Sequence, residues 1–312
     1  MKCLVTGAAG FIGSSITDEL LAKDAKVIGI DCFMDYYSRD IKESNLINAK
    51  KSTNFSFIEG DLNQLDLASL LKDVDYVFHQ AAQAGVRASW GDQFSLYTVN
   101  NIQATQRLLE AVKVNSNVKK IVYASSSSVY GDAEKYPTIE TDLPKPMSPY
   151  GVSKLAAEHL MVLYAKQFNI PTVSLRYFTV YGPRQRPDMA FHRFIRAGLT
   201  GKPITIYGSG EQIRDFTYIS DIVNANIAAA KSDSVGSVYN LGGGTQISVN
   251  QVLELLTGMI GELNIDRQPP QPGDVFRTGA DTTKAFNELG FKPQFSLESG
   301  LSKEIDWIKS II

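Results

Sequence analysis

A glycine-rich turn between a short strand and a helix constrains this chain more than any other feature. The run at 6–13, Thr-Gly-Ala-Ala-Gly-Phe-Ile-Gly, joins an apolar strand-like segment at 3–5 to an amphipathic segment at 11–22. There a pyrophosphate can approach bare backbone and the positive end of a helix. The context therefore predicts a dinucleotide site, because glycines of an ordinary turn lack the flanking strand and helix. The residues expected to form this cradle are Gly7, Gly10, Phe11, Ile12 and Gly13.

An acidic residue closes the second strand-like segment. Residues 26–30 lead into Asp31, at the spacing that a ribose-binding carboxylate needs. A carboxylate there accepts hydrogen bonds from the adenosine hydroxyls and repels a 2'-phosphate, and residues 32–37 contain no arginine or lysine to neutralise one. The sequence therefore favours NAD over NADP, with simple capping of a turn as the alternative role for Asp31.

Apolar segments alternate with helical patterns as far as Tyr177. Such alternation predicts a parallel sheet covered by helices on both faces, a doubly wound α/β (Rossmann) fold. After Tyr177, glycine and proline clusters separate shorter elements, which indicates a smaller, loop-rich lobe. We predict a dinucleotide-binding domain at 1–176 and a mainly substrate-binding lobe at 177–312, with about 213–242 returning to the first domain. The predicted strands are Lys2–Thr6, Lys26–Ile30, Phe55–Glu59, Val74–His79, Lys119–Ala124 and Thr172–Tyr177.

Bulk composition is that of a compact enzyme. The 312 residues are 44% apolar and 21% charged, enough to build a sizeable core. A net charge of -2 and a pI near 6.0 argue against general affinity for nucleic acid or anionic membranes. The sequence shows neither an apolar leader nor a run of bilayer length, so we expect a cytoplasmic protein. The three histidines lack metal-ligand spacing, so no metal site is predicted.

The pair Tyr150 and Lys154 is the candidate catalytic centre. Ser148 as N-cap and Pro149 in the first turn begin a helix that apolar residues carry to about Phe168. Tyr150 and Lys154 share one face of it, where the ammonium and the helix N-terminus would favour phenolate over phenol. We expect a general base that takes a proton from a hydroxyl while nicotinamide takes the hydride. An exposed pair on a solvated face is the alternative.

A run of serines, Ser125 to Ser128, ends the fifth predicted strand and continues into Val-Tyr-Gly131. Hydroxyl groups at the carboxyl end of a parallel strand face the ligand crevice, so one of them can hold the reacting hydroxyl beside Tyr150. Solvation of the strand end explains Ser125 and Ser128 equally well.

Together these features resemble the extended short-chain dehydrogenase/reductase family, and within it the nucleotide-sugar 4-epimerase branch. The cradle, the segment 126–131 and the Tyr150/Lys154 pair carry the resemblance, which covers essentially the whole chain. It implies an NAD-dependent isomerase of a UDP-sugar, with Ser126 as catalytic serine and with Tyr150 and Lys154 also touching the cofactor. The further implied cofactor contacts are Asp61 and Leu62 at the adenine, Ala81 near the diphosphate, Asn101 in a structural and cofactor role, and Tyr177 at the nicotinamide.

The resemblance also implies a substrate site in the second lobe. Tyr207 is expected to stack on the uracil, Arg214 to bind the diphosphate and Asp274 to bind the uridine ribose. The diphosphate arginine of the family's last third is replaced by Gln271, with Arg277 as the candidate substitute. The other expected substrate contacts are Arg87, Ser126, Ser127, Ser128, Thr179, Arg186 and Thr205, with surface charge as the alternative role for Arg87.

One departure separates this chain from family members that dehydrate or decarboxylate the 4-keto intermediate. Those members carry a glutamate just before Val-Tyr-Gly, where this chain has Ser127 and Ser128. Without that acid/base, elimination or loss of carbon dioxide has no assigned helper, which disfavours a 4,6-dehydratase or a decarboxylase. A non-enzymatic dinucleotide-sensing protein is a further alternative, and it would not need Tyr150, Lys154 and Ser126 together.

The segment 182–193 bears on the identity of the sugar. It is similar to that of UDP-glucuronate 4-epimerases, and Arg186 between prolines offers a planar donor fork for a C6 carboxylate, with Thr179, Ser127 and Ser128 as neutral donors. We therefore predict reversible conversion of UDP-glucuronate to UDP-galacturonate through a 4-keto intermediate. UDP-glucose and UDP-N-acetylglucosamine stay open as substrates. Diphosphate binding or a solvated loop is the alternative role for Arg186.

Two long helical patterns, at about 93–114 and 149–168, carry apolar residues on more than one face. One apolar stripe can cover the sheet, and the other can pack against the same helices of a second chain. The resemblance to a family with paired-helix dimers therefore leads us to expect a homodimer.

Overall fold

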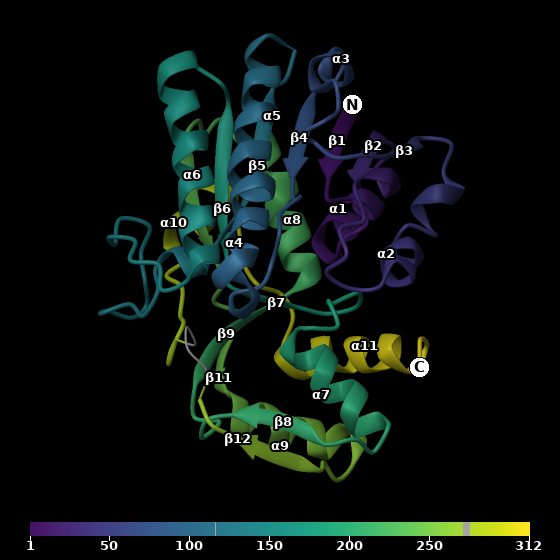
Figure 1. Ribbon diagram of the computed structural model, residues 1–312, viewed down its shortest axis with the longest axis vertical. Coiled ribbons are helices and arrows are strands. Elements are labelled where there is room, and N and C mark those ends of the chain that lie inside the picture. The colour runs from purple at the N-terminus through teal and green to yellow at the C-terminus, as the bar shows by residue number, and fades with distance from the viewer. Residues whose placement is uncertain (116, 271–274) are drawn as a thin grey trace.

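A seven-stranded parallel sheet forms the larger part of the molecule (Figure 1). The computed structural model describes residues 1–115, 117–270 and 275–312. The strand order is β10-β6-β5-β4-β1-β2-β3, so the chain starts inside the sheet and winds outward in both directions, which confirms the predicted doubly wound α/β fold. The strands are β1 (Lys2–Thr6), β2 (Lys26–Asp31), β3 (Phe55–Glu59), β4 (Tyr76–His79), β5 (Lys120–Ser126), β6 (Thr172–Tyr177) and β10 (Ser237–Leu241).

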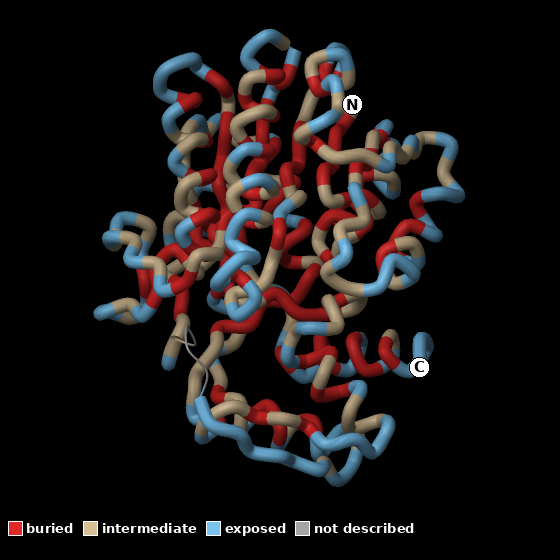
Figure 2. The backbone as a smooth tube through the Cα atoms, viewed as in Figure 1, coloured by how far each residue is buried: buried red, intermediate tan, exposed pale blue. Residues whose placement is uncertain are grey.

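Successive residues of β1 face two separate cores. Cys3 and Val5 pack with helices α1 (Phe11–Ala22) and α8 (Ile219–Lys231), and this core continues into the second lobe. Leu4 points to the other face, toward helices α3 (Leu67–Leu71), α5 (Ala104–Lys113) and α6 (Pro149–Phe168). Because both faces of the sheet are covered, consecutive residues of the central strands β1, β4, β5 and β6 are buried rather than alternately exposed. Figure 2 shows the resulting concentration of buried residues along the central strands.

The second lobe contains two small sheets. Strand β9 (Ile213–Tyr218) lies between β7 (Thr179–Tyr181) and β11 (Thr245–Ser248), and β8 (Ile204–Tyr207) pairs with β12 (Ile265–Gln268). Of the segment 213–242, the part that joins the large sheet is therefore α8 with β10, which pairs in parallel with β6. The remaining α-helices are α2 (Arg39–Asn45), α4 (Phe94–Tyr97), α7 (Ala190–Leu199), α9 (Val249–Ile260), α10 (Thr283–Leu289) and α11 (Leu297–Lys309). Among the described residues, no helix has both the length and the apolar character that crossing a membrane requires.

The long helix expected at about 93–114 is divided into three parts. A π-helical segment, Thr98–Gln103, separates α4 from α5. Within it, the carbonyl oxygen of Asn101 accepts a hydrogen bond from the Thr105 hydroxyl at 2.6 Å. A π segment adds a residue to the turn, which periodicity alone does not reveal, and such segments are frequent at functional sites.

Candidate active site

The glycine cradle between β1 and α1 has room for backbone only. Gly7 has a φ of +69°, and the Gly10 N–H donates to the Gly7 carbonyl oxygen at 3.0 Å. A Cβ atom on Gly13 would lie 2.1 Å from that oxygen, and one on Gly7 would lie 2.8 Å from the Ala81 nitrogen. Helix α1 begins directly after the turn. The turn therefore offers the close backbone approach that a dinucleotide pyrophosphate needs.

Asp31 closes β2 beside the cradle. Its carboxylate accepts hydrogen bonds from the N–H groups of Ala9 at 3.1 Å and Phe33 at 2.9 Å. Burial raises the pKa of Asp31, while the hydrogen bond from Phe33 and the charge of Lys42 oppose the rise. Lys42 lines the same cavity, and its ammonium donates to the Met34 carbonyl oxygen. Sequence reasoning missed Lys42 because this residue lies on α2, and only the fold returns it to the carboxylate.

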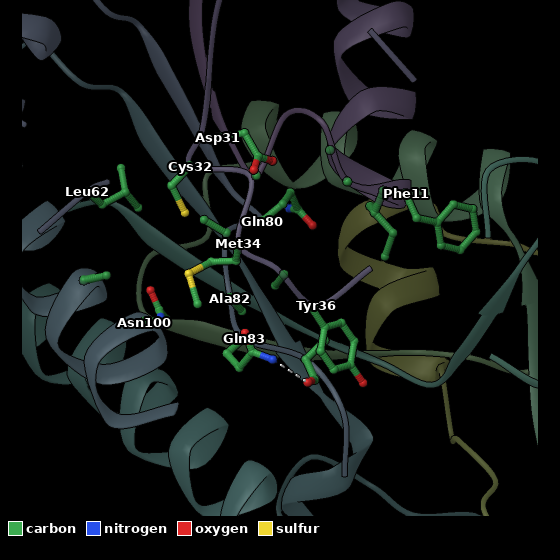
Figure 3. A pocket seen from close by; sticks show the side chains of 18 of the residues that line it. Phe11, Asp31, Cys32, Met34, Tyr36, Leu62, Gln80, Ala82, Gln83 and Asn100 are labelled. Carbon is green, nitrogen blue, oxygen red and sulfur yellow. Dashed lines mark hydrogen bonds between the residues drawn. The ribbon is translucent and has the colours of Figure 1, made fainter. Parts of the chain in front are cut away.

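One cavity, the cofactor cavity, extends from the glycine cradle to Tyr150 and Lys154. Figure 3 shows Asp31 and Cys32 on one side of it and Gln83 and Tyr36 on another. The lining thus runs from a carboxylate suited to a ribose, past the cradle, to a tyrosine and a lysine, so these residues fit a dinucleotide. The predicted cofactor residues that line this cavity are Gly7, Gly10, Phe11, Ile12, Gly13, Asp31, Asp61, Leu62, Ala81, Tyr150, Lys154 and Tyr177.

Asn101 is an expected cofactor residue that does not line this cavity. Its side chain is 1% exposed and accepts a hydrogen bond from the Gln83 N–H at 2.7 Å. Its amide nitrogen donates to the Gln83 carbonyl oxygen at 3.1 Å and to the Ser153 hydroxyl at 2.9 Å. These hydrogen bonds agree with the structural role expected of Asn101, and its cofactor contact stays a prediction. Asn100 lines the cavity instead.

Helix α6 carries the catalytic pair. The Ser148 side chain accepts a hydrogen bond from the Gly151 N–H at 3.1 Å, which begins the helix at Pro149 as the sequence predicts. Tyr150 then faces the cavity and hydrogen-bonds with Ser126, the last residue of β5. The fold thus brings together a strand-end serine and a helical tyrosine that are far apart in the sequence.

Burial disfavours charge on both members of the pair. It raises the pKa of Tyr150, against the opposing effects of the Ser126 hydrogen bond and the positive charge of Arg186. It lowers the pKa of Lys154 to about 7, with the charge of Glu158 opposing. The pKa of Tyr150 is thus shifted away from neutrality, contrary to the expected direction, because desolvation outweighs the Ser126 hydrogen bond and the Arg186 charge. The nearby cation that acts on Tyr150 is Arg186.

A buried ion pair fixes α6 against the sheet beneath the site. The guanidinium of Arg176, on β6, donates to both carboxylate oxygens of Glu158 at 2.7 and 3.0 Å. The Ser125 hydroxyl donates to the same carboxylate at 2.6 Å. Ser125 thus has a hydrogen-bonding role between β5 and α6, although it also lines the cofactor cavity. The network sets the register in which Tyr150 faces Ser126.

A second cavity, the substrate cavity, lies in the smaller lobe and is lined by several of the residues expected to bind substrate. The Arg87 guanidinium lies 4.4 Å from the centroid of the Tyr207 ring. This contact covers one face of the ring, so a uracil can stack on Tyr207 from the opposite face or after Arg87 moves. The expected substrate residues that line this cavity are Arg87, Thr179, Thr205, Tyr207 and Arg214.

A third, hydroxyl-rich cavity adjoins the second, because Thr179 and Arg214 line both. Ser127, Ser128 and Thr278 also line it. Neutral donors and acceptors of this kind suit the hydroxyl groups of a sugar.

The last third of the chain supplies fewer of the expected contacts. Asp274 and Gln271 lie outside the described residues. Arg277 donates to the Gln246 side chain at 3.2 Å and lies 5.2 Å from the centroid of the Tyr136 ring. Its role as the substitute diphosphate arginine stays a prediction.

Arg186 lines the cofactor cavity, whereas Thr179 lines the two substrate cavities. The Nε and Nη2 atoms of Arg186 each donate to a carboxylate oxygen of Asp188 at 2.9 Å. The Tyr36 hydroxyl donates to the same carboxylate at 3.3 Å. Arg186 and Thr179, which were expected to clamp the carboxylate together, therefore line different cavities. Sequence reasoning missed Asp188 and Tyr36, although an acid two residues after the arginine was a visible signal.

The chain belongs to the NAD dependent epimerase/dehydratase family, whose model matches residues 3–242. An uncharacterized UDP-glucose epimerase of Bacillus subtilis is 48% identical over 100% of this chain and 99% of its own length. A UDP-glucuronate 4-epimerase of Thermodesulfobacterium geofontis is 40% identical over 99% of this chain and 96% of its own length. The crystal structure of UDP-glucuronic acid 4-epimerase from Bacillus cereus in complex with UDP-glucuronic acid and NAD superimposes with a TM-score of 0.96 and 46% identity, covering 100% of both chains. The resemblance to nucleotide-sugar 4-epimerases is confirmed.

Proposed function

We propose that this protein is an NAD-dependent 4-epimerase that interconverts UDP-glucuronate and UDP-galacturonate. The observation that carries the choice of sugar is the position of Arg186, which lines the same cavity as Tyr150 and acts on it electrostatically. In a hexuronate the carboxylate is attached to the carbon next to C4. A guanidinium beside the base that serves C4 therefore suits this substrate better than a neutral hexose.

The chemistry follows from the residues around C4. Ser126 and Tyr150 hold the 4-hydroxyl. The Ser126 hydrogen bond and the Arg186 charge favour the Tyr150 phenolate against the effect of burial, and in that form Tyr150 takes the proton as general base. When bound in the cradle, NAD supplies the hydride acceptor and donor. Ser127, Ser128 and Thr179 offer neutral hydrogen bonds that a 4-keto sugar can exchange as it turns. Once the hydride has returned to the opposite face of C4, Tyr150 gives the proton back to the 4-oxygen, so the alcohol is inverted and no net redox change results.

UDP-glucose is the rival substrate, and the name of the Bacillus subtilis relative favours it. The lyase alternatives have less support, because Ser127 and Ser128 stand where an acid/base would assist elimination or loss of carbon dioxide. The risk of decarboxylation gives Arg186 a second role. A 4-keto glucuronate is a β-keto acid, so an epimerase must hold its carboxylate out of line with the carbonyl, and Arg186 is the candidate holder.

The test is a panel of UDP-glucuronate, UDP-glucose and UDP-N-acetylglucosamine with the purified protein. We expect UDP-galacturonate as the main product of UDP-glucuronate and a kcat/KM at least about tenfold above that for UDP-glucose, as one charge-assisted contact predicts. The pentose product of decarboxylation should stay minor. Faster epimerisation of UDP-glucose than of UDP-glucuronate would assign the enzyme to the neutral sugar.

We further propose that the protein works as a homodimer in the cytoplasm. Phe94 and Val99 on the α4–π segment are 36% and 39% exposed, and Val152 and Leu163 on α6 are 46% and 49% exposed. Burying these apolar side chains between paired helices is a common route to symmetric dimers. Sedimentation should give twice the monomer mass, and Val152→Lys should shift the protein toward monomer. A monomer at every concentration would contradict this assembly.

A further inference from the structure

The Arg186–Asp188 pair lies where the cofactor and substrate cavities meet. Arg186 lines the cofactor cavity, Asp188 lines the substrate cavity, and Tyr36 lines both. Asp188 occupies the Nε and Nη2 edge of the guanidinium at 2.9 Å on both contacts. This two-point geometry gives an arginine–carboxylate pair more energy and more directionality than a single hydrogen bond. Any carboxylate on the sugar must therefore compete with one that the protein itself supplies.

Asp188 is held in place from a second direction. The Tyr36 hydroxyl donates to its Oδ2 atom at 3.3 Å, and the Arg186 guanidinium lies 5.9 Å from the Tyr36 ring centroid. A Cβ atom on Gly85 would lie 2.2 Å from that hydroxyl, so only a glycine at position 85 leaves room for the Tyr36 side chain in this position. The Arg186 and Asp188 side chains are 25% and 36% exposed, which leaves the pair within reach of a ligand.

Epimerisation imposes a condition on any carboxylate clamp. Between removal and return of the hydride, the 4-keto sugar must turn so that its other face meets the cofactor, and its carboxylate moves with the ring. A carboxylate fastened to Arg186 would resist that movement. A guanidinium released into a half-buried cavity without a partner would also be unfavourable. The turn is therefore easier when Arg186 has another carboxylate to bind.

We propose that Asp188 is an exchange partner for Arg186: it takes the guanidinium back when the carboxylate of the substrate leaves during rotation. The inference rests on the proposed function, because only an acidic sugar has a carboxylate to exchange. Asp188 thereby weakens binding of UDP-glucuronate and speeds its turnover, since it lowers the free energy of the released state. A neutral UDP-sugar makes no such exchange.

The test compares Asp188→Asn with wild type on two substrates. The amide keeps the shape and removes the competing charge, so KM for UDP-glucuronate should fall by about three- to tenfold and kcat should fall by a similar factor. Both constants for UDP-glucose should change by less than about twofold. Tyr36→Phe should move the UDP-glucuronate constants in the same direction by a smaller factor, because Asp188 loses the hydrogen bond that holds it beside Arg186 and so competes less well, without any change of charge. Asp92→Asn, on an exposed residue, is the matched charge control.

A binding measurement separates affinity from turnover. In a Tyr150→Phe background, calorimetry should show UDP-glucuronate binding tighter by about three- to tenfold when Asp188→Asn is added, and UDP-glucose unchanged. Far-UV circular dichroism and NAD content check that each variant is folded. Should Asp188→Asn fail to fold, Tyr36→Phe carries the same prediction.

Three results decide the inference. A raised KM for UDP-glucuronate in Asp188→Asn would make Asp188 a residue that orients Arg186, and this would overturn the exchange. Unchanged constants, or equal changes for both sugars, would overturn it as well. Absence of wild-type activity on UDP-glucuronate would remove the proposed function and the inference together, whereas normal wild-type activity with an unaltered variant removes only the inference.

Discussion

The two halves of the molecule hold an arginine in different surroundings. In the sheet half, the Arg176 and Glu158 side chains are 4% and 3% exposed. In the substrate half, Arg186 and Asp188 form the same two-point contact with 25% and 36% exposure. The two ion pairs therefore differ in how far they are buried and not in the geometry of their contacts. A pair that water cannot reach fixes structure, whereas a pair in a cavity wall can change partners when a ligand arrives.

The same contrast holds for the two binding regions. Cofactor residues follow β1, β2 and β4 at one edge of one sheet, where neighbouring strand ends are necessarily close. The substrate cavity draws on β7, β8 and β9 and on the loop that carries Arg87, from both halves of the chain. We therefore expect changes in the sheet half to act on stability or on every substrate, and changes in the lobe to act on particular substrates.

The largest effect is expected at Tyr150, where the halves meet. Tyr150→Phe removes the proton acceptor and little volume, so turnover should fall by about 10²- to 10⁴-fold for every UDP-sugar. NAD content should stay normal, because the cradle is untouched. Chromatography of the UDP-sugars and of NAD released by denaturation measures both. Near-normal epimerisation by the variant would place the base elsewhere.

Breaking the buried pair comes next. Glu158→Gln leaves the Arg176 charge buried without its counter-ion, so the free energy of unfolding should drop by about 3 to 5 kcal/mol. The control is Glu134→Gln, whose partner Lys145 and own side chain are 57% and 77% exposed, and which should cost less than about 1 kcal/mol. Urea unfolding followed by circular dichroism gives both values. Equal losses would contradict the role assigned to burial.

The partly exposed pair of Arg186 and Asp188 should affect substrate binding much more than stability. Arg186→Gln removes a charge-assisted contact of about 1.5 to 3 kcal/mol, so UDP-glucuronate should bind about ten- to a hundredfold more weakly. UDP-glucose should be affected far less, and the free energy of unfolding should change by less than about 1 kcal/mol. Calorimetry in the Tyr150→Phe background measures the affinities. If both sugars weaken alike, Arg186 belongs to the diphosphate or to the surface.

The effect that is smallest near neutral pH belongs to the sheet half and grows as the pH falls. His79 is buried, with its ring nitrogens 2.8 Å from the Thr6 hydroxyl and 3.0 Å from the Thr105 hydroxyl. Burial lowers the pKa of His79 from 6.5 to about 3. Between these values the unfolded chain binds a proton that the native protein does not. Its contribution to stability is therefore complete above pH 6.5 and is lost as the pH falls, by up to about 1.4 kcal/mol per unit.

His79→Gln tests this dependence, because the amide can still hydrogen-bond but does not titrate. Urea unfolding between about pH 4 and pH 6 should give a steeper loss of stability for wild type than for the variant. Parallel curves would show that His79 does not account for the acid sensitivity.

Sequence prediction succeeded where a pattern reports local geometry. The bounds of β1, β3 and β6 and of helix α6 agree with the predicted segments, since strand periodicity and the Ser148 cap act within a few residues. The cradle was equally legible, because its glycines, its strand and its helix are consecutive. Even the serine at the end of β5 could be placed, since parallel strand ends share one edge of the sheet.

Prediction failed where the answer depends on residues brought together from a distance. The sequence does not show that Gln83 and Ser153 engage the Asn101 amide, because these residues lie 18 and 52 positions away along the chain. Lys154 was expected to lower the pKa of Tyr150, but the depth of burial, which no local pattern reports, raises it.

The sequence by itself determined the fold class, the dinucleotide cradle and the residues that can act as base. These depend on hydrogen-bonding patterns, helix capping and the spacing of apolar residues along neighbouring parts of the chain. Only the tertiary structure decided that Arg186 faces Tyr150, that Asp188 and Tyr36 hold it, and that Lys42 lies beside Asp31. The reason is physical: charge pairing and desolvation depend on distances through space, and those distances are set by packing of the whole chain.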